Sequence, residues 1–452
     1  MTLLNELSAE VCQRARMSRD PRFDGRFFVA VKTTGIFCRP ICPANLPKEE
    51  NVEYFSSQAL AVSAGYRPCL RCRPESAPHS WAWKGAETTF LRALTLIEQG
   101  ELDGSLETLA SRLGISDRYL RQLFQRHLGM PPKQYAQIQQ LMFAKQLLHT
   151  SQISITEVAY ASGFQSTRRF NDAFQKLFRL TPTQVRRERA ALPSRNHLSL
   201  AFRGPFDWAH MLDFYRLRAI EGMELVDEQS YQRHFVLGEG TGWFKASMAQ
   251  SHLDIEFEME RLSDLRHLVA RLRRMFDLDA DLISIEAHLE QLAPGLVRRT
   301  GIRIPGVWNA WEAGVRAVLG QQVSVKAAIG QLNLLVSTLA ASEGSTRYFP
   351  TPEQVQMSDL SFLRMPERRK ETLKRLADYV RLHPMDSPMA WLSLSGIGPW
   401  TVDYAQLRGE SRSHCFLTGD LIVKKALAKF PHLTAESVAP WGSYATFHCW
   451  SH

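Results

Sequence analysis

The chain has 452 residues, a length that suggests about three domains. Hydrophobic residues make up 44% and charged residues 22% of it, which is typical of a globular protein with real cores and excludes a disordered chain. The net charge of +9, with an isoelectric point near 9.2, favours a polyanionic partner, most often nucleic acid.

The N-terminus and the hydropathy pattern argue against export and membrane insertion. The segment from Met1 to Glu6 has neither the basic region nor the apolar region of a signal peptide. No uninterrupted apolar run approaches the length of a membrane span. We therefore expect a cytoplasmic, nucleoid-associated protein in a reducing compartment, with no membrane partner.

Residues 1–78 form the first expected domain. The pattern predicts a helix over 6–16 and a short strand over 27–31 that is followed by a turn at 32–35. A second short strand over 52–55 precedes a helix over 57–64, which ends at Gly65. A domain of this size has a small core, so a bound metal would supply folding energy directly.

Two close cysteine pairs stand out in this domain. Each pair has the spacing of two adjacent corners of a tetrahedral metal site, and four thiolates favour zinc; the pairs are Cys38 with Cys42 and Cys69 with Cys72. The alternatives are four buried free thiols or two disulfides. The absence of a secretory signal argues against disulfides.

The residues around the cysteines carry a resemblance. The run VKTTGIFCRP from Val31 to Pro40, and GYRPC from Gly65 to Cys69, resemble the N-terminal domain of the Ada family of bacterial alkylation-response proteins. The resemblance implies that Cys38, held as a thiolate by Zn²⁺, irreversibly accepts one methyl group from a methylphosphotriester in DNA. Thr34 and Arg67 are candidate neighbours of the phosphate, although an ordinary solvated arginine explains Arg67 equally well.

Residues 86–190, after a linker over 76–85, are expected to be all-helical. Apolar residues keep helical spacing on both sides of a turn at 114–116, and the same layout recurs around 162–164. This duplication predicts two helix-turn-helix motifs whose second helices enter the major groove. Seven Lys or Arg against two acids between Gln165 and Arg189 also favour DNA over the alternative of a plain solvated bundle.

This segment resembles the AraC-type regulatory domain, down to FQKLF at 174–178 and Thr181-Pro182. Arg179 departs from the family, which usually has Gly at this helix end. The resemblance implies promoter DNA as a partner, and RNA polymerase as a further partner if the protein is an activator. Candidate base or phosphate readers at the starts of the recognition helices are Arg118, Arg168 and Arg169. We expect a monomer.

A connector over 186–196 is expected before the third region. Strand-like alternation at 198–202, 232–237, 243–246 and 253–258, with a helix opening at 206–208, predicts a small α+β lobe over 197–285. From 263 onward the pattern is helical to the end of the chain.

The stretch LSLSGIGPWT at 392–401 predicts a helix-hairpin-helix. Gly396 and Gly398 let backbone amides approach a DNA phosphate at a helix N-terminus, and Thr401 belongs to the same candidate DNA contact. Asp420 follows Gly396 by 24 residues. A helix-hairpin-helix followed by an aspartate at about this distance resembles the signature of the helix-hairpin-helix DNA glycosylases.

The whole third region resembles AlkA-type 3-methyladenine DNA glycosylases, including GPFDW at 204–208 and GVRAVLGQQVSV at 314–325. The resemblance makes Asp420 the catalytic carboxylate, whose bland alternative is a helix N-cap. It places three aromatic residues in a pocket for a cationic alkylated base, with core packing as their alternative: Trp400, Tyr404 and Trp450. Residues 286–452 would form the glycosylase domain.

Two residues depart from the best-known glycosylases of this type. Gln322 stands where an apolar wedge fills the gap left by the flipped base, and Leu421 replaces an aromatic residue after the catalytic acid. A Pro-Cys-His-Arg segment, the acceptor motif for O6-methylguanine, is absent from the sequence.

The sequence thus predicts a multidomain α+β protein: a small zinc-bound α/β domain, an all-α double helix-turn-helix domain, a small α+β lobe and an all-helical helix-hairpin-helix domain. The predicted function is alkylation repair joined to regulation, in which methylation of Cys38 removes one negative charge and strengthens DNA binding. The alternative is a regulator whose glycosylase-like lobe only binds DNA.

Overall fold

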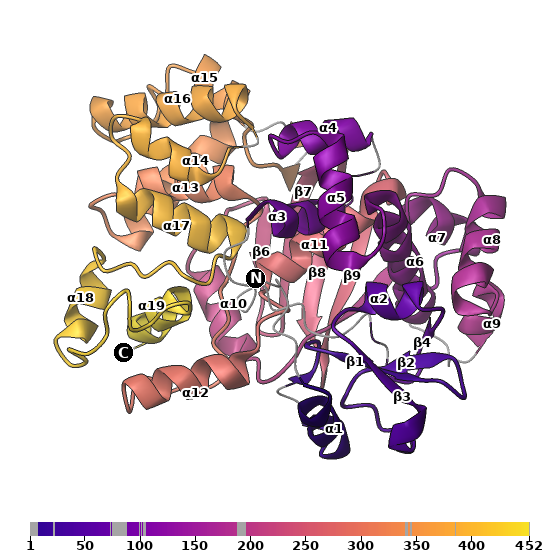
Figure 1. The fold of residues 1–452 in the computed structure, drawn as a ribbon. Coiled ribbons are helices and arrows are strands. Elements are labelled where there is room, and N and C mark those ends of the chain that lie inside the picture. The colour runs from indigo at the N-terminus through magenta and orange to yellow at the C-terminus, as the bar shows by residue number, and fades with distance from the viewer. Residues whose placement is uncertain are drawn as a thin grey trace. The chain divides into compact units, whose positions relative to one another are not determined.

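The computed structural model describes most of the chain (Figure 1). The described residues are 8–20, 23–72, 74, 88–98, 100, 102, 105–187, 196–339, 342–343, 346–384 and 386–451. They divide into two compact units, residues 1–199 with 261–270 and residues 200–260 with 271–452. The expected linker at 76–85 lies outside the described residues.

The first unit begins with a four-stranded sheet in the order β3-β1-β2-β4, in which β1 runs antiparallel to β2 and β3 and β4 runs parallel to β2. Its elements are α1 (Ala9–Met17), β1 (Phe28–Val31), β2 (Ile36–Cys38), the 3-10 turn Glu49–Asn51, β3 (Val52–Phe55), α2 (Gln58–Ser63) and β4 (Arg67–Pro68). The predicted strands and second helix are present, whereas β2 and β4 were not predicted because each is too short for alternation to show.

The start of the first helix differs from the prediction. The described helix α1 begins at Ala9, because the hydroxyl of Ser8 accepts a hydrogen bond from the Val11 amide and so caps the N-terminus. The core of this domain is small, with Cys12, Phe27 and Val29 among its few buried residues. This agrees with a domain that depends on a metal for stability.

The rest of the first unit described here is helical and duplicated. Its helices are α3 (Thr88–Glu98), α4 (Leu106–Arg112), α5 (Asp117–Leu128), α6 (Pro132–Thr150), α7 (Ile155–Ala161), α8 (Thr167–Phe178) and α9 (Pro182–Arg187). The pairs α4–α5 and α7–α8 are the two helix-turn-helix motifs. In each motif both helices begin at a serine whose hydroxyl accepts a backbone N–H: Ser105, Ser116, Ser154 and Ser166. The expected connector is partly wrong, because Arg186 and Arg187 belong to α9; residues 188–195 lie outside the description.

The second unit opens with a five-stranded sheet in the order β5-β9-β8-β7-β6. Its strands are β5 (His197–Ala201), β6 (Glu224–Val226), β7 (Ser230–Leu237), β8 (Gly240–Met248) and β9 (His252–Met259), with α10 (Trp208–Arg216) between β5 and β6. The strands β6 to β9 form antiparallel pairs between neighbours along the chain. The predicted α+β lobe is present, and β6 is an addition.

Helices then dominate to the end of the described chain. They are α11 (Leu265–Met275), α12 (Leu282–Leu292), α13 (Ala310–Gly320), α14 (Val325–Leu339), α15 (Pro352–Met357), α16 (Glu367–Leu382), α17 (Pro399–Glu410), α18 (Leu421–Leu427) and α19 (Gly442–Trp450), with 3-10 turns at Leu262–Asp264 and η6 (Pro388–Ser393). The all-helical prediction is wrong at one place, where β10 (Ser342–Glu343) and β11 (Thr346–Arg347) pair. Within the described ranges, no helix combines the length and the hydropathy that a membrane crossing needs.

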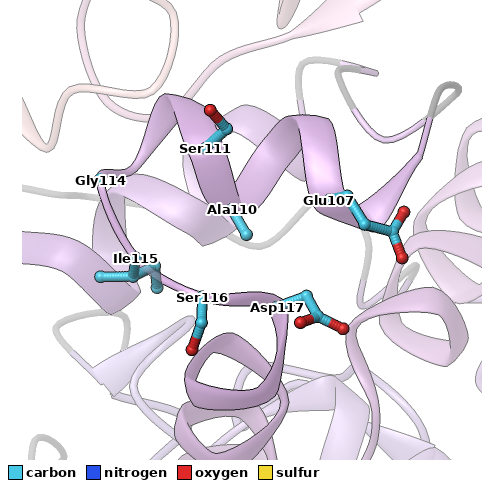
Figure 2. Close-up of a pocket in the computed structure, with 7 residues that line it drawn as sticks. All are labelled: Glu107, Ala110, Ser111, Gly114, Ile115, Ser116 and Asp117. Carbon is cyan, nitrogen blue, oxygen red and sulfur yellow. The ribbon is translucent and has the colours of Figure 1, made fainter.

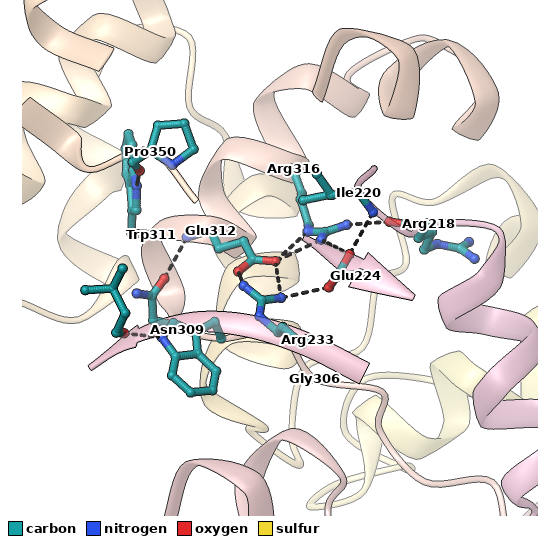
Figure 3. A network of polar contacts seen from close by, with 12 residues as sticks. Arg218, Ile220, Glu224, Arg233, Gly306, Asn309, Trp311, Glu312, Arg316 and Pro350 are labelled. Atoms are coloured by element: carbon teal, nitrogen blue, oxygen red, sulfur yellow. Dashed lines mark hydrogen bonds and ion pairs between the residues drawn. The ribbon is translucent and has the colours of Figure 1, made fainter. Parts of the chain in front are cut away.

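A buried ion network joins the sheet of the second unit to α13 (Figure 3). Arg233 on β7 donates to Glu312 at 2.5 Å and to Glu224 at 2.7 Å, and Arg316 donates to Glu312 at 2.8 Å. Burial alone would raise the pKa of Glu312, but Arg233 and Arg316 lower it to about 2. The network therefore holds α13, and with it the loop that follows Gly320, against the sheet.

Candidate metal centre and aromatic pocket

The sheet of the first domain brings the four cysteines together. Cys38 ends β2, and the parallel pairing of β4 with β2 places Cys69, whose amide donates to the Phe37 carbonyl at 2.9 Å, beside it. The turn after Arg39 supplies Cys42. All four sulfur atoms lie within 4.8 Å of one another. A tetrahedral zinc with Zn–S bonds of about 2.3 Å needs sulfur atoms about 3.8 Å apart, so the cage fits zinc.

The cysteines differ in exposure and protonation. Cys38 is half-buried, whereas the other three are buried. A hydrogen bond from Cys38 lowers the pKa of Cys42 to about 7 and also lowers the pKa of Cys69, while the bonds among the thiols raise the pKa of Cys38. Cys38 is therefore the most accessible cysteine of the cluster.

Arg39 is a supporting residue that sequence reasoning missed. Its guanidinium donates to both carboxylate oxygens of Asp24, at 2.8 Å to Oδ1, and to the Cys72 carbonyl at 3.3 Å. Its amide donates to the Cys72 sulfur at 3.3 Å. Arg39 thus ties the two cysteine pairs to each other. Only its position next to Cys38 hinted at this role.

The two predicted phosphate neighbours lie near the strand that carries Cys38. Thr34 is exposed in the turn before β2, and Arg67 is half-buried opposite Ile36 in the β2–β4 pair. The Arg67 amide donates to the Gly35 carbonyl at 2.8 Å. Both residues are therefore held by backbone pairing close to the chain segment that ends at Cys38.

The predicted DNA readers of the helix-turn-helix motifs are exposed. Arg118 lies in the first turn of α5, and Arg168 and Arg169 lie in the first turn of α8. The turn of the first motif also forms an open hollow of about 460 Å³ between α4 and α5. Figure 2 shows Glu107 and Asp117 at one side of this hollow, which contains none of the predicted catalytic residues.

The predicted hairpin is present, with η6 as its first helix and α17 as its second. Gly396 has φ +92, and a Cβ there would lie 2.1 Å from the Thr372 hydroxyl, so only glycine fits. Gly398 caps α17 in an extended conformation. Thr401 differs from the prediction, because its side chain is buried and its hydroxyl accepts a hydrogen bond from Gln321 at 3.2 Å. Its hydroxyl therefore supports the hairpin from inside.

Gln321 is a second residue that the sequence did not single out. Its side-chain amide also donates to the Gly396 carbonyl at 3.2 Å. The next residue, Gln322, is exposed with φ +57 in the loop between α13 and α14. The side chain of Gln321 therefore joins the loop between α13 and α14 to the hairpin turn at Gly396 and to α17 at Thr401.

Asp420 is a helix N-cap, which was the structural alternative to a catalytic role. It caps α18, since Oδ1 accepts the amides of Ile422 at 2.9 Å and Val423 at 3.2 Å. The same oxygen accepts the Trp450 indole N–H at 3.1 Å. The cap fixes the carboxylate beside an aromatic side chain, so the structural role and a catalytic role are compatible. Leu421, the next residue, is 68% exposed.

Four aromatic side chains form two stacked pairs, one of which contains the Trp450 that donates to this carboxylate. Trp400 and Tyr404 on α17 stack with ring centroids 5.3 Å apart, and Trp450 faces Phe214 at 6.3 Å with nearly parallel planes. Phe214, from α10, was missed by the sequence analysis. The buried side of α10 is formed by Met211, Leu212 and Tyr215, and a half-exposed phenylalanine beside that side was the available signal.

Two arginines contact these aromatic side chains. Arg218 lies 3.7 Å from the Phe214 ring centroid, and Arg408 donates to the Tyr404 hydroxyl at 2.9 Å. Burial alone would raise the pKa of Tyr404, but Arg408, Arg218 and Arg316 together lower it. Burial lowers the pKa of Arg218 to about 10. The arginines therefore favour the anionic form of the Tyr404 hydroxyl relative to a free tyrosine, against the effect of burial.

A four-cysteine metal centre, a duplicated helix-turn-helix and a helix-hairpin-helix with its acid define a DNA-binding protein of repair and regulation. Family models match in the same order: the metal binding domain of Ada over residues 11–75, a helix-turn-helix domain over 109–188 and the AlkA N-terminal domain over 197–309. The first of these matches supports zinc as the cofactor of the four-cysteine cluster.

Named relatives extend these matches along the chain. The probable bifunctional transcriptional activator/DNA repair enzyme AlkA of Mycobacterium tuberculosis is 34% identical over 98% of this chain and 96% of its own length. DNA-3-methyladenine glycosylase 2 of Escherichia coli is 33% identical over 56% of this chain and 96% of its length. The Ada enzyme of Escherichia coli is 35% identical over 38% of this chain and 47% of its length. The chain belongs to the family of bifunctional transcriptional activator/DNA repair enzymes of the AlkA type.

Proposed function

We propose that this protein repairs alkylated DNA by two reactions and regulates transcription. Its third region hydrolyses the glycosidic bond of N-alkylated bases such as 3-methyladenine, as a monofunctional glycosylase. Its first domain transfers one methyl group from a DNA methylphosphotriester to Cys38, in a single turnover that switches on sequence-specific DNA binding. The proposed domains are 1–78, 86–190, 197–285 and 286–452.

One observation carries the glycosylase proposal: the Asp420 carboxylate, fixed by a helix cap, accepts the indole N–H of Trp450 at 3.1 Å, and Trp450 is stacked on Phe214. A cationic alkylated purine binds electron-rich aromatic faces by stacking and by cation–π attraction. Trp400 and Tyr404, which stack on each other, offer such faces.

The reaction then follows from the properties of an alkylated base. The C1′–N bond breaks and its electron pair leaves with the base, which neutralises the positive charge of the purine. Asp420 stabilises the positive charge that develops on the sugar, and water adds to C1′ with loss of a proton to the carboxylate. The hairpin at Gly396 and Gly398 holds a backbone phosphate, and exposed Gln322 fills the gap left by the flipped base.

The methyl transfer uses the accessible ligand of the cluster. Bound zinc keeps the thiolates deprotonated at neutral pH. The Cys38 sulfur attacks the methyl carbon, the carbon–oxygen bond breaks, and the phosphate leaves as a diester anion while Cys38 becomes a thioether. Thr34 and Arg67 orient the phosphate. The loss of one negative charge at the cluster favours binding to the phosphate backbone.

A base-release assay on methylated duplex DNA tests the glycosylase. In the variant Asp420→Asn, asparagine still accepts the α18 amides and still caps a helix well, so only the charge is lost. We expect base release to fall by at least about a hundredfold. The control is Asp378→Asn, an acid on α16 paired with Arg381. Full release by the Asp420 variant would leave the alternative, a regulator whose third region only binds DNA.

Mass spectrometry tests the methyl acceptor. After exposure to an oligonucleotide with a methylphosphotriester, the wild-type chain should gain a single methyl group, located on Cys38, and Cys38→Ser should gain none. Cys12→Ser, a change of a buried cysteine outside the cluster, should still be methylated. A wild-type chain without an adduct would overturn the acceptor role.

The regulatory proposal rests on the exposed arginines of α5 and α8. Arg118, Arg168 and Arg169 contact promoter DNA, and RNA polymerase is the further partner of a protein that acts as a cytoplasmic monomer. Replacing Arg168 and Arg169 by Ala should weaken promoter binding in a mobility-shift assay while base release is unchanged. Equal promoter binding by the variant would remove α8 from the interface.

A further inference from the structure

The chain is strongly basic around the start of helix α16. From Arg364 to Arg375 it has six Lys or Arg against two acids. Arg368 and Arg375 are exposed, and they lie four and three residues from the buried Thr372, so the three side chains share one face of the helix. We call Arg368 and Arg375 the α16 arginine pair.

This face of α16 packs against the hairpin turn. The Thr372 hydroxyl lies 3.5 Å from the Ser395 carbonyl oxygen, and the same hydroxyl leaves no room for a side chain at Gly396. The Arg375 guanidinium donates to the Ser395 carbonyl at 3.4 Å. Because Ser395 comes directly before Gly396, this contact holds a cation at the edge of the turn that binds a phosphate in the proposed complex.

Both arginines can donate further hydrogen bonds. A guanidinium has five N–H groups, and Arg375 uses Nη1 for Ser395 and Nη2 for Glu371 at 2.8 Å, with 42% of its side chain exposed. An exposed Arg–Glu pair is weak and screened by salt, so a phosphate can take the place of Glu371. Among the residues that the structure describes, the Arg368 side chain has no ion-pair partner. Both guanidinium groups can therefore bind phosphate oxygens, which match their geometry.

We propose that the α16 arginine pair is a second phosphate-binding surface of the glycosylase, which contacts the DNA backbone next to the phosphate held by the hairpin. This inference rests on the proposed function, in which the hairpin binds duplex DNA. At 1.5 Å per residue, about 10 Å of helix axis separates the two arginines, so they contact different phosphates. Phosphate contacts do not read base sequence, so this surface positions any duplex target.

The pair should act on binding and not on bond cleavage. It attracts the bound substrate and the transition state equally, because the phosphates keep their charge while the glycosidic bond breaks. Loss of a cation therefore raises the protein concentration needed for half-maximal base release and leaves the rate at saturation unchanged. Each lost contact also lowers the salt dependence of release, because fewer counterions are displaced from the DNA.

The experiment uses the full chain with four variants. Arg375→Gln and Arg368→Gln each remove one cation, and Arg375→Lys keeps the charge without the guanidinium geometry. Arg381→Gln is the matched control. Arg381 is also 42% exposed and is also paired with an acid, Asp378 at 2.8 Å, but helical periodicity places it on another face of α16. Single-turnover release from a duplex with one N-alkylated purine is measured at increasing protein concentration and at several salt concentrations.

We expect Arg375→Gln and Arg368→Gln each to need several-fold more protein for half-maximal release, with a saturated rate within about twofold of wild type. The slope of log affinity against log salt should be smaller by about one unit in each. Arg375→Lys should keep the wild-type slope, and Arg381→Gln should behave as wild type. Half-maximal concentrations and slopes equal to those of Arg381→Gln would overturn the proposal. So would a fall confined to the saturated rate, since a merely structural contact with the hairpin gives that result.

Arginine labelling separates this proposal from the glycosylase proposal. The wild-type chain is treated with phenylglyoxal, which modifies accessible guanidinium groups, with and without undamaged duplex DNA, and the labelled positions are read by mass spectrometry. DNA should slow the labelling of Arg368 and Arg375 several-fold and leave that of Arg381 unchanged. If the wild type releases no base, the glycosylase proposal fails, and this protection still decides whether α16 contacts DNA. Equal labelling of all three arginines with and without DNA would overturn the inference.

Discussion

Among single residues, Arg179 departs from the AraC-type pattern at a helix end where the backbone is left-handed. Helix α5 ends at Gly129 in the left-handed conformation with φ +67, and α8 ends at Arg179 with φ +57. Both residues donate their amide to the carbonyl four positions earlier, so the two helix-turn-helix motifs end their recognition helices in the same way. Glycine adopts this conformation without strain, whereas an arginine does so at a cost of about 1 kcal/mol.

Arg179→Gly should therefore stabilise the helix-turn-helix domain by about 0.5–1 kcal/mol, since the gain at the cap exceeds the flexibility that glycine adds to the unfolded chain. The measurement is the urea midpoint of the helical circular dichroism signal. The matched control is the opposite change at the equivalent cap, Gly129→Arg, which should lower the midpoint. A lower midpoint for Arg179→Gly would show that the arginine side chain contributes more than its backbone costs.

Asp277 provides a pH-dependent prediction in the second unit. Burial raises the pKa of this carboxyl to about 7, although it accepts hydrogen bonds from the Tyr444 hydroxyl at 2.9 Å and the Ile304 amide at 3.2 Å. The folded state keeps the proton up to about pH 7, while the unfolded state loses it near 3.8. The stability that this group contributes is therefore present below pH 4 and is lost as the pH rises to 7.

The test compares wild type with Asp277→Asn, which keeps an oxygen acceptor for Tyr444 and Ile304 and does not ionise. The difference in unfolding free energy between the two proteins should change by up to roughly 4 kcal/mol between pH 4 and pH 8, in favour of the variant at high pH. A constant difference across this range would mean that Asp277 is ionised throughout.

Among the secondary structure elements of the second unit, the side chain of Gln321 connects the loop after α13 to the hairpin turn and to α17. The ion network of Arg233, Glu312 and Arg316 holds α13 to the sheet. The residue that follows α13, Gln321, donates hydrogen bonds to the hairpin at Gly396 and to α17 at Thr401. The helix-hairpin-helix and the loop that carries the exposed Gln322 are therefore joined through a single side chain.

Gln321→Leu should lower base release from duplex DNA by about tenfold, because the two hydrogen bonds that position the loop between α13 and α14 are lost. The Gly396 carbonyl also loses a donor. Gln322→Ala should also slow release by removing the side chain that fills the gap. We expect the double variant to be scarcely slower than the worse single variant, since both changes remove one function. Additive losses in a double-mutant cycle would show that Gln321 and Gln322 act separately.

At the scale of the whole molecule, the two proposed chemistries lie in different compact units. The four cysteines belong to the first unit, and Asp420, Trp400 and Trp450 belong to the second. Neither proposed mechanism uses a side chain from the other unit. One chain thus has two repair sites with separate requirements for charge, metal and pocket.

Crossed variants test this independence. Cys38→Ser should release bases from methylated DNA at the wild-type rate, within about twofold, and Asp420→Asn should accept a methyl group at the wild-type rate, because sites without shared partners behave additively. The measurements are base release and mass spectrometry on the same preparations. A loss of more than tenfold in either crossed combination would show that the two units are coupled.

Features that depend on local spacing and residue type could be predicted from the amino-acid sequence alone. The cysteine pairs, the repeated helix-turn-helix layout and the hairpin glycines with Asp420 are recognisable because their structure or chemistry needs those residues at those distances along the chain. Their presence was enough to predict the fold class and the family. The roles of Cys38 and Asp420 stay predictions until the variants are measured.

Tertiary structure decided the contacts between residues that are ordinary in their local sequence. The parallel pairing of β2 with β4 closes the cysteine cage, Phe214 faces Trp450 from a distant helix, and Lys145 is buried against Cys69. It also turned the side chain of Thr401 away from solvent. Long-range packing leaves no periodic signal in the chain, since a phenylalanine or a lysine on a helix satisfies the same pattern whether it lies in a core, on a surface or at a site.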